Sequence, residues 1–211
     1  IAAEAQPATD EAVRQHKREI GFDSERPLVM AFGGGLGARS INTAIISILP
    51  TLQQKNIQVL LVAGKANFAA AQAAATSYQG DDAHILEFVS SGMLDMLSAA
   101  DVVVTRASAT SLQELAGLAK PTIIVPARQL GDQQKNAELF ATARAAVVYS
   151  DDQLEQDSGV LATEIMSILD DEARRDELSR AIHNFARPEA AHDVAALIVD
   201  CLQSSNSRSD K

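Results

Sequence analysis

Residues Asp101–Glu114 read DVVVTRASATSLQE, an apolar strand that runs directly into the start of a helix. Val102–Thr105 are β-branched, as is typical of a strand buried on both faces. Ser108 and Ser111 precede helix-forming residues, and hydroxyl side chains at such a junction cap a helix N-terminus. Because that end carries free N–H groups and partial positive charge, it is an anion site. We expect a phosphate near Ser108 and a sugar near Glu114; an ordinary capped βα unit is the alternative.

The same strand-to-helix alternation extends over most of the chain. Strands are predicted at 27–32, 57–64, 84–89, 101–105, 121–125 and 145–149. Helices are predicted at 38–49 (ended by Pro50), 67–78, 93–100 (capped by Ser90 or Ser91), 132–143, and from Asp151 onward with a break near Arg187 and Pro188. The strands are continuous apolar runs, which indicates a parallel sheet covered on both faces. The sequence therefore predicts an α/β fold with a Rossmann-like, doubly wound sheet, whose ligands bind in the loops after the strands.

The length of 211 residues suits one large domain with flanking segments. We expect residues 1–26 to be a lead-in or interdomain segment with a helix at 10–20, capped by Thr9 or Asp10 and ended by Gly21. Residues 27–203 would form the ligand-binding domain, and the polar residues 204–211 a disordered tail.

Composition excludes several classes of protein. The net charge of -10 and the 4% aromatic content argue against binding to nucleic acid. The single cysteine, Cys201, has no partner for a disulfide or a cysteine metal site. No signal peptide and no run of about 18 apolar residues is present, so a cytoplasmic location is expected. The histidines form no catalytic or metal-binding motif, and we predict neither a metal site nor a catalytic base in this chain.

A glycine-rich loop, Gly33–Ala38, follows the first strand and matches G-x-G-x-x-A. A dinucleotide site would also need an acidic residue after the second strand, and Val62–Lys65 contains none. The loop therefore marks either a close approach of backbone to a ligand or a sharp turn. Arg39 begins the next helix, where a cation is unfavourable, which indicates a specific partner or a salt bridge. Arg106 and Lys65 could each face an anion or solvent.

Another polar cluster, Gly131–Asn136, lies at the start of a later helix. The amides of Gln133 and Gln134 can donate to and accept from sugar hydroxyls. A helix cap with solvated glutamines is the alternative.

Taken together, these motifs resemble the donor-binding half of the MurG family, GT-B glycosyltransferases that transfer GlcNAc from UDP-GlcNAc to lipid I to form lipid II. The matching motifs are GGGLGARSIN at 33–42, Phe88-Val89, RASATSLQE at 106–114, Pro121–Pro126, QQKNA at 133–137 and ARPEAA at 186–191. They occur in order over about residues 27–203. The resemblance departs from the family at Gly35, where a serine is usual, at Ser108, where a glycine is usual, and in the short loop before Gln133, which lacks the usual histidine.

The resemblance implies a role for each part of a donor site. Val89 would meet uracil beside Phe88, the segment Ser108–Ser111 would hold the pyrophosphate, and Glu114 would hold the ribose. Gln133 and Gln134 would bind the GlcNAc hydroxyls. The implied donor-binding residues are Gly34, Gly35, Arg39, Asn42, Phe88, Val89, Arg106, Ser108, Ala109, Thr110, Ser111, Glu114, Gln133, Gln134 and Asn136.

The resemblance also implies that an N-terminal acceptor domain, with the catalytic base and the lipid contact, is absent here. The chain alone would then be inactive, as one half of an inverting, metal-independent hexosyltransferase without a cofactor. The full-length enzyme would act in peptidoglycan synthesis, and so in cell-wall growth, shape and division, at the cytoplasmic face of the membrane. The alternatives are the donor domain of another GT-B or split two-chain UDP-sugar transferase, and a non-catalytic nucleotide-sugar binding module.

Overall fold

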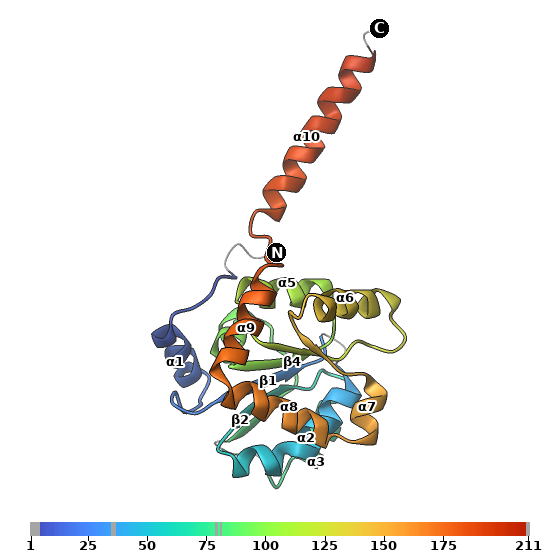
Figure 1. The fold of residues 1–211 in the computed structure, drawn as a ribbon. Coiled ribbons are helices and arrows are strands. Elements are labelled where there is room, and N and C mark those ends of the chain that lie inside the picture. Colours follow the sequence, from blue (N-terminus) through green and yellow to red (C-terminus); the bar gives the residue numbers. More distant parts are fainter. Residues whose placement is uncertain (1–4, 35–36, 79, 81, 210–211) are drawn as a thin grey trace.

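The computed structural model describes residues 5–34, 37–78, 80 and 82–209, with the backbone alone at 200–209. Its strands are β1 Leu28–Phe32, β2 Gln58–Val62, β3 Ala83–Leu86, β4 Val102–Thr105, β5 Thr122–Ile124 and β6 Val147–Val148. Its helices are α1 Asp10–Glu19, α2 Arg39–Gln54, α3 Phe68–Ala74, α4 Met93–Ala99, α5 Ala109–Gly117, α6 Gly131–Thr142, α7 Asp151–Gln156, α8 Gly159–Asp170, α9 Glu172–His183 and α10 Ala190–Ser209. Figure 1 shows α10 projecting away from the body that the other elements form.

The strands form one parallel sheet in the order β3-β2-β1-β4-β5-β6. This is the Rossmann order, and it confirms the predicted doubly wound α/β fold. Phe32 at the end of β1 is in register with Val62 of β2 and with Thr105 of β4. The loops that follow these three strands therefore meet at one edge of the sheet.

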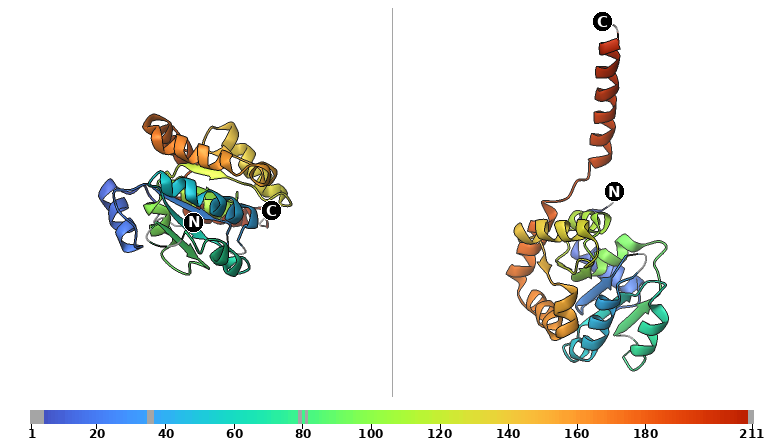
Figure 2. Two further views of the ribbon diagram at one scale, coloured as in Figure 1. Left: turned by 90° about the horizontal axis from the view of Figure 1, so that it is seen from below. Right: turned by 90° about the vertical axis from the view of Figure 1, so that its right-hand side faces the viewer.

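Helices cover both faces of the sheet (Figure 2). Two apolar layers lie beneath them, because successive strand residues point to opposite faces. Met30 and Phe32 pack with α4, α5 and α6, whereas Val29 and Ala31 pack with α2, α3 and α8. Helix α9 contributes to both layers. The strands are consequently buried throughout, which explains why they read as continuous apolar runs rather than alternating ones.

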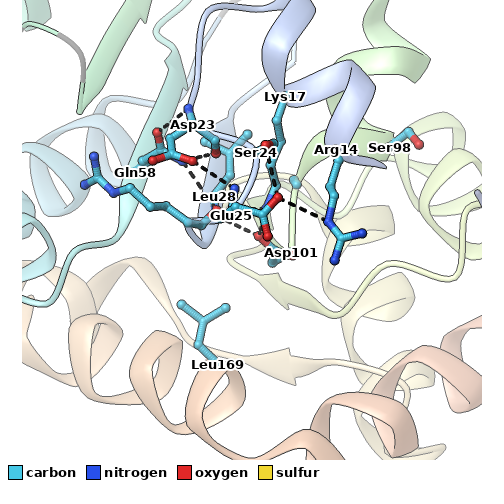
Figure 3. Close-up of polar contacts among 12 residues, drawn as sticks. Arg14, Lys17, Asp23, Ser24, Glu25, Leu28, Gln58, Ser98, Asp101 and Leu169 are labelled. Atoms are coloured by element: carbon cyan, nitrogen blue, oxygen red, sulfur yellow. Dashed lines mark hydrogen bonds and ion pairs between the residues drawn. The ribbon is translucent and has the colours of Figure 1, made fainter. Parts of the chain in front are cut away.

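The lead-in segment is attached to the sheet through a buried ion pair (Figure 3). Lys17 of α1 lies 2.8 Å from the Asp101 carboxylate, and the same Asp101 oxygen accepts from the Leu28 N–H at 2.7 Å. Lys17 also donates to the Arg26 carbonyl. As predicted, Thr9 caps α1, and Gly21 follows its end with a φ of 84°. The Asp101 carboxylate thus joins α1 to the starts of β1 and β4.

A second buried cation, Lys120, lies near Asp101 and donates to the carbonyls of Ser98 and Ala100. Burial lowers the pKa of Lys120 to about 8, and the Asp101 charge opposes this shift. The pKa of lysine in an unfolded chain is about 10.4. Between about pH 8 and about pH 10.4 the unfolded chain therefore binds more protons than the folded one. The free energy of unfolding should therefore rise by roughly 2 kcal/mol between about pH 7.5 and about pH 9.5, relative to a Lys120→Met variant. Urea unfolding of both proteins at the two pH values measures this difference, and parallel pH profiles would contradict it.

The predicted end of the second helix at Pro50 is wrong. Helix α2 continues through Pro50 to Gln54. A proline inside a helix removes one hydrogen bond, but continuing the helix buries Leu52 completely in the core. The helix ends instead where Asn56 takes a left-handed conformation, with a φ of 60°.

Other local predictions were also wrong. Gly92, with a φ of 76°, precedes α4 in place of a capping serine. Strand β3 ends at Leu86, so Phe88 and Val89 lie in the following loop. Residues 204–209, predicted to be disordered, belong to α10. Once nucleated by the apolar residues before them, such residues extend a helix at one hydrogen bond per residue. Residues 210–211 lie outside the described residues.

Candidate functional site

A cavity of about 150 Å³ lies at the carboxyl edge of the sheet. The side chains and backbone that line it belong to Phe32, Gly34, Val62, Phe88, Val89, Met93 and Ser111. It therefore brings together the glycine-rich loop, the Phe88-Val89 loop and the first turn of α5. These are three of the segments that the sequence assigns to one ligand. Gly35 lies outside the described residues.

The N-terminus of α5 has the predicted serine cap. The Ser108 hydroxyl accepts from the Ser111 N–H at 3.3 Å and donates to the Ser111 hydroxyl at 2.8 Å. Ala109 and Thr110 are exposed, and their N–H groups have no acceptor among the described residues. Two unpaired donors at the positive end of a helix are available to an anion.

Glu114 lies three residues after Ser111, and therefore on the same side of α5. It is partly buried, and this burial raises the pKa of its carboxyl group. A partly desolvated carboxylate accepts hydrogen bonds more strongly than an exposed one. Glu114 is thus placed to accept from hydroxyl groups of a ligand bound at the start of α5.

Arg106 was expected to face an anion or solvent, and it is largely shielded from solvent. Its guanidinium forms an ion pair with Asp151 at 2.8 Å and donates to the Ser40 hydroxyl at 3.0 Å and the Val125 carbonyl at 2.9 Å. The side chains of Arg106 and Asp151 are only 13% and 8% exposed. The charge of Arg106 is therefore neutralised within the chain.

The amides of the α6 segment hold loop backbone. The Ala127 N–H donates to Gln133 at 2.9 Å, and Gln134 donates to the Ala127 carbonyl at 3.2 Å. Asn136 donates to the Ala107 carbonyl at 3.0 Å. The alternative prediction was that both glutamines are solvated. It is wrong for the Gln133 oxygen and the Gln134 nitrogen, which bond to the Ala127 backbone. Both glutamines fix the loop after β5, and Asn136 fixes the loop that leads into α5.

Asn42 and Arg39 have different environments in the first turn of α2. Asn42 is buried and donates to the Ala63 carbonyl at 2.9 Å, which ties α2 to the loop after β2. Arg39 is exposed. Lys65, in the same loop as Ala63, lies 5.2 Å from the centre of the Phe88 ring, a cation–π distance. Phe88 itself is 49% exposed at the mouth of the cavity.

Sequence reasoning missed several residues of this region. Met93, Phe32 and Val62 line the cavity but are indistinguishable from core residues in the sequence. Asp151 was missed because no candidate residue was assigned to the loop after the sixth predicted strand. Its position after a parallel strand was the available signal.

The described residues contain no group of three or more histidine, cysteine or acidic side chains that could hold a metal ion. Within the same part of the chain, no helix has the length and apolar character needed to cross a membrane.

Comparisons of the sequence and of the fold with known proteins both point to glycosyltransferases. Residues 28–194 match the model of the glycosyltransferase family 28 C-terminal domain. The chain is similar to UDP-N-acetylglucosamine–N-acetylmuramyl-(pentapeptide) pyrophosphoryl-undecaprenol N-acetylglucosamine transferases. The protein from Porphyromonas gingivalis is 34% identical over 180 residues, which are 84% of this chain and 46% of the relative. That from Flavobacterium psychrophilum is 30% identical over 190 residues, 88% of this chain and 49% of the relative.

The crystal structure of Acinetobacter baumannii MurG superposes with a TM-score of 0.72 at 22% identity, over 93% of this chain and 54% of that one. This likeness confirms the fold of a GT-B C-terminal domain. The chain spans about half the length of the curated relatives it matches. Because the family match covers most of the described residues, the chain belongs to the glycosyltransferase family 28 C-terminal domain family.

Proposed function

We propose that this chain binds UDP-GlcNAc as the donor half of an N-acetylglucosaminyltransferase that converts lipid I to lipid II. The observation that carries the proposal is the cavity shared by Gly34, Phe88, Val89 and Ser111, beside the unpaired N–H groups of α5. The family match and the names of the relatives support the same donor.

In this proposal, each part of the donor would have a group of suitable chemistry near it. A cavity of about 150 Å³ holds a benzene-sized ring, and uracil is a single ring of that kind. The N-terminus of α5 would bind the diphosphate, and Glu114 would accept from the ribose hydroxyls. The loop that Gln133 and Gln134 hold would face the GlcNAc, with Arg39 near the glycine-rich loop.

The proposed reaction is an inverting transfer without a metal or another cofactor. The α5 N-terminus would stabilise the negative charge that develops on the UDP leaving group, as preorganised donors do in other active sites. The base and the site for the lipid-linked acceptor would lie outside these 211 residues. This chain alone would therefore bind the donor without transferring it. The acceptor lipid would bring the whole enzyme to the cytoplasmic face of the membrane, where it would serve cell-wall synthesis.

Calorimetric titration of the chain with UDP, UDP-GlcNAc, UDP-glucose and ADP tests this function. We expect UDP and UDP-GlcNAc to bind more tightly than ADP, and chelation of divalent ions to leave the affinities unchanged. Equal binding of UDP and ADP would contradict a uridine site. Tighter binding of UDP-glucose than of UDP-GlcNAc would favour a transferase with another donor sugar.

Replacing Glu114 by alanine should weaken UDP binding by about 1–3 kcal/mol, because hydroxyl groups of the ribose would lose their acceptor. Glu177→Ala is the matched control, since Glu177 is an exposed glutamate of α9. An unchanged UDP affinity in a folded Glu114→Ala protein would show that Glu114 does not contact the ribose.

A further inference from the structure

A partly buried polar cluster, formed by Ser40, Arg106 and Asp151, adjoins the segment that leads into α5. One Asp151 carboxylate oxygen accepts from Arg106 at 2.8 Å and from the Ser40 hydroxyl at 2.5 Å. Arg106 also donates to Ser40 at 3.0 Å, so each member bonds to both of the others. We call these three residues the Ser40 cluster.

The Ser40 cluster joins segments that are far apart in the sequence. Ser40 lies in the first turn of α2, and Asp151 is the first residue of α7. Arg106 follows β4 directly, two residues before Ser108, the cap of α5. The Arg106 guanidinium also donates a hydrogen bond to the Val125 carbonyl, in the loop after β5. The cluster therefore connects the N-termini of α2 and α5, both of which lie at the carboxyl edge of the sheet.

The segment between Arg106 and Ser108 is held from a second side as well. Asn136 of α6 donates to the carbonyl of Ala107 at 3.0 Å. Ala107 is buried, so this backbone has little freedom to move. Consecutive residues before the α5 N-terminus are thus fixed by α7 and by α6.

We infer that Asp151 is a positioning residue for diphosphate binding: through Arg106 and Ser40 it holds the α5 N–H donors in place relative to the start of α2. This inference rests on the proposed function. Removing the carboxylate leaves a buried guanidinium without a counter-charge, which is strongly unfavourable. Arg106 would then turn towards solvent and displace the backbone before Ser108. Donors that must be reordered on binding give lower affinity than donors already in place.

The test compares Asp151→Ala and Asp151→Asn with the control Asp152→Ala, whose side chain is exposed and pairs only with exposed Arg128 among the described residues. We expect Asp151→Ala to weaken UDP binding about tenfold while uridine affinity changes less than about twofold. Asp151→Asn, which keeps an acceptor oxygen, should lie between these values. Asp152→Ala should bind both ligands like the original protein. An unchanged ratio of UDP to uridine affinity in folded Asp151→Ala would overturn the inference, because a general loss of structure would weaken both ligands together.

Hydrogen exchange of backbone amides tests the same positioning role in the absence of a ligand. The Ser111 and Leu112 amides, which donate to the Ser108 hydroxyl and the Ser108 carbonyl, should exchange faster in Asp151→Ala than in Asp152→Ala, with the strands unaffected. If Asp151→Ala does not fold, Ser40→Ala replaces it, since it removes two bonds of the Ser40 cluster and keeps the ion pair. Absence of UDP binding by the original protein would overturn the proposed function and the ligand role of Asp151 together. Unchanged exchange of the Ser111 and Leu112 amides would overturn the positioning role alone.

Discussion

Replacing Asp101 by alanine should lower the free energy of unfolding by about 3–5 kcal/mol, the usual cost of breaking a buried ion pair. The side chain of Lys17 is only 6% exposed, so its ammonium group cannot regain water without moving α1. The same substitution leaves the Leu28 N–H without its acceptor at the start of β1. Urea unfolding followed by circular dichroism measures the change.

Two further variants separate the causes of this loss. Glu25→Ala removes an exposed ion pair with Arg14 in the same segment, and should cost less than about 1 kcal/mol. Lys17→Met combined with Asp101→Ala should be more stable than Asp101→Ala alone, because no unpaired ammonium group is then buried. If the double variant is no more stable than the single one, the buried charge is not the cause.

Replacing Gly37 by alanine should destabilise the fold by about 3 kcal/mol or more. Gly37 has a φ of 76°, and a Cβ atom there would lie 2.2 Å from the Ala63 carbonyl oxygen and 2.8 Å from the Asn67 side-chain nitrogen. The carbonyl belongs to backbone at the end of β2, so relief requires the start of α2 to move away from the sheet. Asn42, which holds the same carbonyl, would be displaced with it.

Gly34 supplies the matched control, because it has almost the same φ, 77°, but a Cβ atom there would have no described atom within 4 Å. Gly34→Ala should therefore show only the cost of a left-handed alanine, about 1–2 kcal/mol. The difference between the two variants in thermal or urea unfolding isolates the close approach to Ala63. Equal destabilisation by both substitutions would contradict a steric role for Gly37.

The strand–helix alternation was predictable because each signal lies within a few residues. Apolar runs such as Val102–Thr105 mark buried strands, and the caps at Thr9 and Ser108 bond to N–H groups three residues ahead. The parallel sheet and its ligand-binding edge follow from this order of elements. The end of α2 was not predictable in this way, since the burial of Leu52 against the sheet outweighs the local effect of Pro50.

The candidate site also combines features that local sequence predicts with contacts that depend on long-range packing. Local signals were enough to predict that the glycine-rich loop, the Phe88-Val89 segment and the α5 start meet, because parallel strands bring their following loops to one edge. Which polar groups remain available to a ligand depends instead on how distant parts of the chain pack together. Arg106 meets Asp151, a residue 45 positions away, because the helices after β6 pack back beside α2. A long polar side chain bonds to whichever group packing places within its reach, and that choice is not encoded in the residues next to it.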